Sequence, residues 1–211
     1  IGKKITIQKL PRKFSVDLII DFSTPKSSIN LAKIASQFRT PIVIGTTGFS
    51  KNQINQLISI SKKIPILQSY NMSIGINIML KIIKDNFEFF NSTDLEIIEK
   101  HHKQKVDSPS GTALLIAENI ANLKNKKLTS IEKYRNKSAN AKRSKHEVGI
   151  SSIRGGNTVG EHTLISYGDT ENITIKHEAL SRSVFAKGAI ELGLKLINKK
   201  KGFYSVIDLL N

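Results

Sequence analysis

The sequence predicts an α/β fold in which a parallel sheet is followed by a second region of mixed helices and strands. Within residues 16–68, three apolar strand-like stretches alternate with two stretches of helical periodicity, a pattern typical of parallel strands joined by crossover helices. Residues 148–177 hold stretches in which apolar and polar residues alternate, as in an antiparallel or mixed sheet. We therefore expect two regions of different architecture.

The elements of the first region follow from its apolar runs and helix-start signals. Ser23-Thr24-Pro25 predicts the start of a helix, because Pro suits the first helical turn. The loops D-F-S-T, G-T-T-G and S-Y-N-M come directly after the strands. The expected elements are, in order, a strand at Val16–Phe22, a helix at Ser27–Arg39, a strand at Pro41–Ile44, a helix at Lys51–Lys63 and a strand at Ile64–Gln68.

These three loops make the first region a candidate for binding a nucleotide. In parallel sheets, ligands lie beyond the carboxyl ends of the strands. A glycine after a strand is by itself a weak signal, since it is common in loops. A G-x-G-x-x-G turn should precede such a region, and the chain, which begins at Ile1, holds none. We therefore expect the chain to be N-terminally truncated and to bind a nucleotide weakly or not at all.

The second region is expected to begin with a long helix and to contain most of the remaining strands. Residues 124–145 are polar and basic, which predicts a surface loop with one short helix. The expected elements are a helix at Ile74–Phe90, a strand at Asp94–Lys100, a helix ending near Leu123, strands at Val148–Arg154, His162–Tyr167 and Ile173–His177, a helix at Ser183–Asn198 and a short helix at Phe203–Leu210.

The stretch His101–Ala113, H-H-K-Q-K-V-D-S-P-S-G-T-A, joins a predicted strand to a predicted helix. Ser110 suits a helix N-cap, and the N–H groups of the first turn, with no side chain at Gly111, could receive a carboxylate. An ordinary capped helix is the alternative for Ser110-Gly111-Thr112. The cations and histidines just upstream favour an anion that must also receive a proton.

His101 and His102 follow a strand, so extended geometry would direct their side chains to opposite faces. A histidine titrates near neutrality and suits proton donation, and Lys105 could neutralise a carboxylate or help to deliver the proton. Adjacent histidines rarely share one metal ion, and no third ligand has suitable spacing, so no metal is expected. Asp107 is expected to be a turn residue.

Two further stretches leave their roles open. The glycine-rich stretch formed by Arg154-Gly155-Gly156 and Gly160-Glu161-His162-Thr163 is typical of a hairpin loop. Its charged residues could instead face the site, and we expect them to have a structural role or to support the residues of the site. Arg182 lies between the last predicted strand and a helix. Its planar guanidinium could bind a carboxylate, or it could simply lie on the surface.

Composition restricts the classes of function. The formal net charge is +16, but the lysines are dispersed, Trp is absent and aromatic residues make up 6%, so a nucleic-acid platform with stacked bases is not expected. The absence of cysteine excludes disulfides and thiolate catalysis. The apolar runs are only as long as strands, and no signal peptide is visible. We expect a cytoplasmic protein without membrane contact.

Together these motifs closely resemble those of the 4-hydroxy-tetrahydrodipicolinate reductase (dihydrodipicolinate reductase) family. The family signature E-x-H-H-x-x-K-x-D-x-P-S-G-T-A is matched in full by Glu99–Ala113. The resemblance covers about residues 16–211. Four shorter motifs also match in order: D-F-S-T-P at Asp21–Pro25, V-I-G-T-T-G at Val43–Gly48, N-M-S-I-G-I-N at Asn71–Asn77 and V-G-E-H-T at Val159–Thr163.

The resemblance implies a Rossmann-type nucleotide-binding domain, with its first βαβ part missing, in residues 1–73 and 183–211. It also implies an α+β substrate-binding and catalytic domain with an open mixed sheet in residues 74–182, the cofactor NADH or NADPH, a small dicarboxylate substrate and a homotetramer. The implied catalytic residues are His101 as acid and Lys105 as its partner. The implied substrate contacts are His102, Ser110, Gly111, Thr112 and Arg182, and the implied cofactor contacts are Phe22, Ser23, Gly45, Thr46, Thr47, Ser69, Tyr70, Asn71 and Met72.

Two other functions remain open from the sequence. A remnant that binds a dicarboxylate but no cofactor would suit a gene that begins near Ile1. A basic nucleic-acid-binding protein would bind DNA or RNA with an affinity that falls steeply as the salt concentration rises and that does not depend on His101. The dispersed lysines argue against the second.

Overall fold

The computed structural model describes residues 16–135 and 142–210. The chain divides into two compact units. The first unit comprises the chain up to Ile74 and returns from Phe185 onward, and the second comprises Gly75–Val184. Among the described residues, no helix combines the length and the apolar character needed to cross a membrane.

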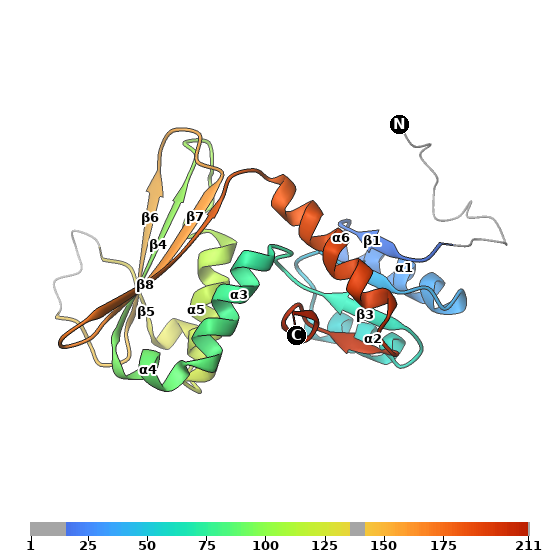
Figure 1. The fold of residues 1–211 in the computed structure, drawn as a ribbon, viewed down its shortest axis with the longest axis horizontal. Helices are drawn as coiled ribbons and strands as arrows, with labels where there is room; N and C mark the ends of the chain where they lie inside the picture. The colour runs from blue at the N-terminus through green and yellow to red at the C-terminus, as the bar shows by residue number, and fades with distance from the viewer. Residues whose placement is uncertain (1–15, 136–141, 211) are drawn as a thin grey trace. The chain divides into compact units, whose positions relative to one another are not determined.

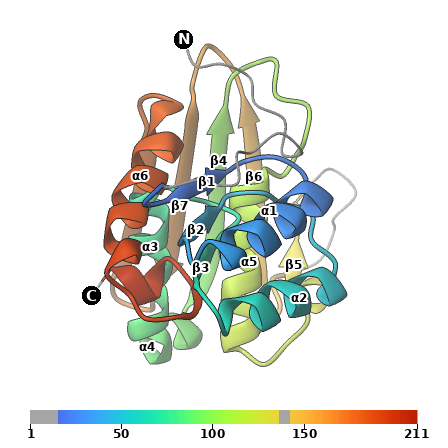
Figure 2. The ribbon, with the colours of Figure 1, turned by 90° about the vertical axis from the view of Figure 1, so that its right-hand side faces the viewer.

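The first unit is a parallel sheet of four strands in the order β1-β2-β3-β9. Helices α1 and α2 lie on one side of the strands and α6 on the other (Figures 1 and 2). The predicted parallel pairing is therefore confirmed. The elements are β1 (Ile19–Asp21), α1 (Pro25–Gln37), β2 (Ile42–Ile44), α2 (Lys51–Ser61), β3 (Pro65–Gln68), α6 (Ser183–Ile197), β9 (Gly202–Tyr204) and the 3-10 turn η3 (Ile207–Leu209).

Both faces of this sheet are buried, which explains why its strands are continuous apolar runs. Ile42, Ile44 and Ile66 pack in the cluster that α1 and α2 complete. Val43 and Leu67 point the other way and pack with α6. The helix starts follow the sequence signals, with Thr24 accepting from the Ser27 N–H and Ser50 forming a capping box with Gln53.

The predicted terminal helix at Phe203–Leu210 is wrong. Residues 202–204 instead form β9, whose backbone pairs with β3 at the edge of the sheet. The apolar pattern of this short segment suits either structure, and the free edge of β3 favours the strand. A single helical turn, η3, follows, and Ser205 and Asp208 exchange hydrogen bonds across its start.

The second unit is a mixed sheet of five strands in the order β5-β6-β4-β7-β8. Strand β4 runs parallel to β6 and antiparallel to β7, which in turn is antiparallel to β8. Helices α3 and α5 lie along one side of this sheet (Figure 1). The elements are α3 (Ile74–Asp85), α4 (Phe87–Ser92), β4 (Asp94–His101), α5 (Gly111–Leu123), the 3-10 turn η2 (Leu128–Ser130), β5 (Glu132–Lys133), β6 (Val148–Arg154), β7 (Gly160–Tyr167) and β8 (Asn172–Ala179).

Three predictions for this unit need correction. The segment between β6 and β7 is not a hairpin loop, because these strands lie on either side of β4 and each pairs with β4. The single helix expected at Ile74–Phe90 is broken at Asn86, whose backbone leaves the helical conformation (φ −117°, ψ 29°). The Asn86 side-chain amide donates to the carbonyl oxygen of Ile82, which also accepts from the Asn86 backbone N–H. The segment expected to be a loop with one short helix contains η2, as predicted, but also the strand β5, which pairs with the first residues of β6. Residues 136–141 of that segment lie outside the described residues.

The inner face of the mixed sheet changes character along its length. Leu95 and Ile97 of β4, with Leu164 of β7, pack against α3 and α5 in one apolar core. Two residues further along β4, the same face carries Glu99 and then His101. The polar end of this face is the candidate site.

Candidate active site

The buried carboxylate of Glu99 is the centre of the site. It is fully buried, and it accepts hydrogen bonds from both terminal nitrogens of Arg154, at 2.8 and 2.6 Å. It also bonds Nδ1 of His101 at 2.5 Å and the backbone N–H of Ser110 at 3.1 Å. Burial alone would raise the pKa of Glu99, but hydrogen bonds from Arg154, Ser152 and His101 outweigh it and lower that pKa to about 2.

This environment determines which nitrogen of His101 carries a proton. A carboxylate that is ionised can only accept, so Nδ1 of His101 must donate. The neutral ring therefore keeps its lone pair on Nε2, and the protonated ring carries an acidic N–H there. His101 is 8% exposed. Burial lowers its pKa, and the hydrogen bond to Glu99 opposes that shift.

A second buried histidine, His162, lies beside His101. The two rings meet edge to face with centroids 5.2 Å apart. Burial, and then the nearby charge of His101, lower the pKa of His162 to about 4. Its Nε2 shares a 2.9 Å hydrogen bond with the hydroxyl of Ser110. Because its pKa is so low, His162 is neutral at pH 7.

Ser110 is the N-cap of α5, as predicted, and its hydroxyl accepts from the N–H of Ala113 at 3.2 Å. Gly111 opens the helix and is exposed, and a Cβ built there would meet no atom within 4 Å. Thr112 follows in the same turn and is half-buried. The first turn of α5 is therefore accessible to a ligand.

The loop between β4 and α5 is tied down by charged groups. Lys105 donates to both carboxylate oxygens of Asp107, at 2.7 and 2.8 Å. This hydrogen bond lowers the pKa of Asp107. Arg154 also donates to the backbone carbonyl of Asp107, at 2.6 Å. Asp107 is therefore more than the turn residue predicted, and Arg154 supports residues of the site, which is within the role that we expected.

His102 and Arg182, which are 80 residues apart in the sequence, come together in the second unit. A terminal nitrogen of Arg182 lies 3.3 Å from Nε2 of His102. Arginine can only donate, so Nε2 of His102 accepts and Nδ1 carries its proton. A cation thus lies beside one of the predicted substrate contacts.

The strand-end loops of the first unit are joined by a buried polar cluster. The hydroxyl of Ser28 donates to the carboxylate of Asp21, and the Thr46 hydroxyl lies 3.3 Å from the same oxygen. Thr46 in turn accepts from the backbone N–H of Ser23 at 3.0 Å. The hydroxyl of Thr46 therefore holds two predicted cofactor loops together, while Ser23 and Thr47 are exposed.

Gly45 and Phe22 show why a glycine occupies the end of β2. A Cβ at Gly45 would lie 2.1 Å from the ring of Phe22. Phe22 is 53% exposed. The absence of a side chain at Gly45 therefore makes room for the ring of Phe22, and this exposed aromatic residue lies at the strand ends, where ligands of parallel sheets bind.

The loop Ser69–Met72 follows β3 at the same edge of the sheet. The Ser69 hydroxyl donates to the carbonyl of Asn71 and accepts from its N–H, at 2.9 and 3.2 Å. Tyr70 is half exposed, but the side chain of Met72 packs in the core behind the loop. Any contact of Met72 with a ligand at this edge is therefore made by its backbone.

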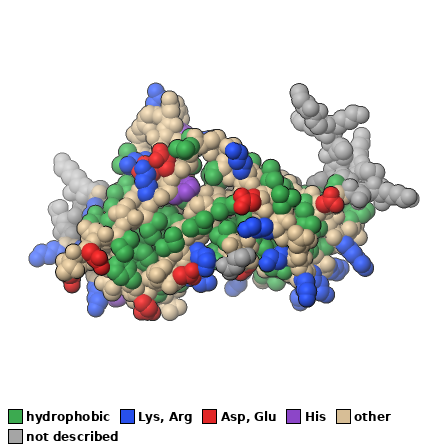
Figure 3. Space-filling view, viewed as in Figure 1, with side chains coloured by type: hydrophobic (Ala, Val, Ile, Leu, Met, Phe, Trp, Pro, Cys, Tyr) green, Lys and Arg blue, Asp and Glu red, His purple; other side chains and the backbone are tan. Residues whose placement is uncertain are grey.

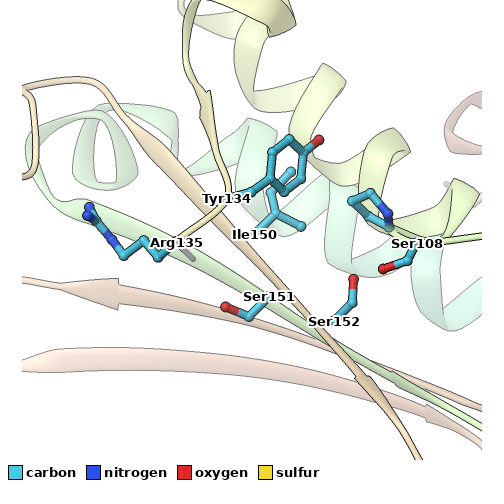
Figure 4. Close-up of a pocket in the computed structure, with 7 residues that line it drawn as sticks. Ser108, Tyr134, Arg135, Ile150, Ser151 and Ser152 are labelled. Atoms are coloured by element: carbon cyan, nitrogen blue, oxygen red, sulfur yellow. The ribbon is translucent and has the colours of Figure 1, made fainter. Parts of the chain in front are cut away.

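A cavity of about 550 Å³ lies on the outer edge of β6, beside the loop that carries Ser108. Ser151 and Ser152 line it from the strand, and Arg135 points away from them (Figure 4). Ser152 pairs with Glu99 in the β4–β6 register. The cavity therefore borders the Glu99 cluster, and the charged residue of its lining, Arg135, pairs with Glu147. In residues 16–135 and 142–210, no three metal-binding side chains lie close enough to hold a metal ion.

From the sequence, no role is predicted for Glu99, and His162 is treated only as part of the glycine-rich stretch before Thr163. A local signal for Glu99 exists, because residues two apart on a strand share a face, and this places Glu99 beside His101. His162 joins the site through strand pairing, in which it lies opposite Glu99. Nothing local in the sequence indicates that neighbour.

Comparisons with known proteins agree with this geometry. A family model described as "Dihydrodipicolinate reductase, N-terminus" matches residues 2–72, and one described as "Dihydrodipicolinate reductase, C-terminus" matches residues 75–210. The 4-hydroxy-tetrahydrodipicolinate reductase of Clostridium tetani is 45% identical, over 92% of this chain and 76% of its own length. The enzyme of the same name from Buchnera aphidicola subsp. Cinara cedri is 44% identical, over 99% and 78%.

Solved structures give the same result. A dipicolinate-bound dihydrodipicolinate reductase from Paenisporosarcina sp. TG-14 matches with a TM-score of 0.74 and 25% identity, over 90% of this chain and 71% of that one. A probable dehydrogenase from Thermotoga maritima, with a TM-score of 0.56 and 10% identity over 92% and 74%, shares the fold. The family models together match nearly the whole sequence. The chain therefore belongs to the dihydrodipicolinate reductase family of oxidoreductases.

Proposed function

We propose that this chain reduces 4-hydroxy-tetrahydrodipicolinate to tetrahydrodipicolinate in lysine and diaminopimelate biosynthesis, with NADH or NADPH as the reductant. The net reaction adds one hydride and one proton to the substrate and releases its hydroxyl group as water. The observation that carries the proposal is a histidine with a fixed ring, His101, next to an accessible helix N-terminus. We further propose that the chain works as a cytoplasmic homotetramer.

The first unit is the proposed cofactor-binding domain, in residues 1–73 and 183–211. A nicotinamide cofactor, when bound, supplies the hydride. The exposed aromatic residue Phe22 and the two strand-end loops held together by the Thr46 hydroxyl support this assignment. The proposed cofactor contacts are Phe22, Ser23, Gly45, Thr46, Thr47, Ser69, Tyr70, Asn71 and the backbone of Met72.

The second unit, in residues 74–182, is the proposed substrate-binding and catalytic domain. His101 gives the proton from Nε2, because Nδ1 is committed to Glu99. Lys105 assists by placing positive charge near the ring, which lowers the pKa of His101 beyond the effect of burial. A lower pKa makes the imidazolium a stronger acid at the moment when negative charge develops on the substrate.

The proposed substrate contacts surround the start of α5 and the end of β4. The first-turn N–H groups at Gly111 and Thr112, positioned by Ser110, would receive one carboxylate. His102 and Arg182 would receive the other, for which the guanidinium supplies a planar pair of donors. A small dicarboxylate is supported by the dipicolinate bound to the Paenisporosarcina structure.

The test is a direct assay of cofactor oxidation. The substrate is made in situ by the synthase that precedes this step, and NADH and NADPH are compared by absorbance. The variants His101→Gln and Lys105→Met are each expected to lower kcat by roughly 10²–10⁴-fold, the usual contribution of a general acid. Circular dichroism melting curves should stay close to that of the parent chain.

The matched control is Lys103→Met, because Lys103 is an exposed lysine in the same loop. It is expected to leave kcat near the parent value. Near-normal rates in both the His101 and the Lys105 variants would show that the assigned roles are wrong. A folded chain that binds dipicolinate but oxidises neither cofactor would support a dicarboxylate-binding protein instead.

A further inference from the structure

We propose that Glu99 is a positioning residue that holds the ring of His101 with its proton on Nδ1, so that Nε2 is the nitrogen that releases the catalytic proton. The catalytic consequence rests on the proposed function. The orientation of the ring does not depend on it, because the hydrogen bonds are present without substrate.

The geometry leaves Glu99 little freedom to rotate. One carboxylate oxygen accepts from His101 and Arg154, and the other accepts from Arg154 and the backbone of Ser110. The carboxylate therefore has donors at both oxygens and no accessible surface. A buried charge with so many partners is costly to move, because any rotation leaves a donor unpaired.

The same carboxylate connects the two sides of the proposed reaction. His101 ends β4, where the proton would leave, and Ser110 caps α5, where a carboxylate would bind. Arg154 completes the link, because it donates to Glu99 and to the backbone of Asp107 in the intervening loop. Glu99 thus sets the distance between the acid and the substrate-binding turn.

Glu99 also supplies a negative charge that raises the pKa of His101 and so favours the protonated ring. The other charged or titratable groups that act on His101 are Lys105 in the loop and Arg154 on β6, with His162 facing it from β7. Burial and the two cations lower the pKa of His101, and Glu99 raises it. Removal of the Glu99 charge should therefore lower that pKa further.

The first experiment needs no variant. The imidazole ¹⁵N spectrum of the parent protein is recorded across the titration of His101, whose signals are assigned with His101→Gln. We expect the neutral ring to carry its proton on Nδ1. A neutral ring with its proton mainly on Nε2 would overturn the proposal, whether or not the protein is a reductase.

The second experiment uses Glu99→Gln, which keeps the size of the side chain and removes its charge. We expect kcat to fall by roughly 100-fold, the lower end of a general-acid contribution, with KM changed far less. The loss of activity at high pH should move to lower pH, and the ¹⁵N spectrum should show both neutral forms of His101.

The matched control is Glu161→Gln. Glu161 points to the opposite face of the same sheet and pairs with Lys100 and Lys176, each at 2.8 Å. It should leave the ¹⁵N spectrum and pH profile of His101 unchanged. If Glu99→Gln fails to fold, the ¹⁵N spectrum of the parent protein still shows which nitrogen of the neutral His101 ring carries the proton. If the parent protein is inactive, the proposed function fails while the ring assignment is still tested.

Discussion

At the scale of single residues, the candidate site combines one buried anion with two histidines whose pKa values are lowered. His162 is the clearer case, because burial brings its pKa to about 4. The unfolded chain binds a proton at this position near pH 6.5, and the folded chain does not until near pH 4. Between pH 6.5 and pH 4, protonation of His162 therefore stabilises the unfolded chain relative to the folded chain.

This linkage predicts the direction in which stability changes with pH. The stabilisation by neutral His162 is fully present above pH 6.5 and is lost as the pH falls to about 4, a loss of roughly 3 kcal/mol. Urea unfolding at pH 7 and pH 4.5 measures it. His162→Gln should flatten this dependence, and the remaining slope has the same sign because the pKa values of His101 and His177 are also lowered.

A control for this prediction is His146→Asn. The pKa of His146 is also lowered, first by the charge of Lys126. That histidine is exposed, so its contribution is screened by solvent and should be small. A pH dependence in His162→Gln as steep as in the parent chain would show that His162 is not the group that opposes folding in acid.

At the scale of elements, helix α6 depends on two glycines for different reasons. A Cβ at Gly188 would lie 2.0 Å from the backbone carbonyl oxygen of Met72, which cannot move without the loop. A Cβ at Gly193 would lie 2.4 Å from the end of the Leu18 side chain, which can rotate away. Only the first contact sets how closely the helix approaches the loop after β3.

We therefore expect Gly188→Ala to destabilise the chain by about 1–3 kcal/mol, the usual effect of overpacking, although alanine is the better helix former. Gly193→Ala, in the same helix, should cost much less. Thermal melting of the two variants makes the comparison. Equal melting temperatures would mean that the backbone at Met72 does not limit the position of α6.

The elements also show which parts of the fold can be predicted from the sequence alone. Strands β1–β3 and the first helices were predictable because each has a local signal, such as the Ser50 cap or the apolar run at β2. The helix breaks at a single residue, Asn86, whose backbone is not helical, and β5 has only two residues. The partnership of Glu99 with Arg154 spans 55 residues. It depends on which strands pair, and no local pattern encodes it.

At the scale of the whole molecule, the main electrostatic feature is the excess of basic over acidic residues. The formal net charge is +16, from 33 basic and 17 acidic residues. Figure 3 shows Lys and Arg side chains scattered over the visible face, with no continuous basic patch. Such a distribution favours overall self-repulsion in the folded state rather than a binding surface.

Local crowding of charge is present between α5 and β6. Burial lowers the pKa of Lys124, and the nearby charges of Lys126 and Arg143 lower it further. Lys126 is exposed, so its substitution removes charge without opening a cavity. Lys126→Gln should raise the melting temperature at low ionic strength. Lys176→Gln should lower it, because Lys176 pairs with Glu161 and Glu178, at 2.8 and 3.2 Å.

The same repulsion predicts that salt stabilises the protein. At low ionic strength, like charges interact over about 30 Å, and near 0.15 M salt that range falls to about 8 Å. Because repulsion acts mainly on the compact state, added sodium chloride should raise the melting temperature, with a gain of 1 kcal/mol corresponding to about 2–4 °C for a chain of this size. Lys126→Gln should gain less from salt than the parent chain. A melting temperature that falls with added salt would mean that favourable ion pairs, such as Arg154 with Glu99, outweigh the net repulsion.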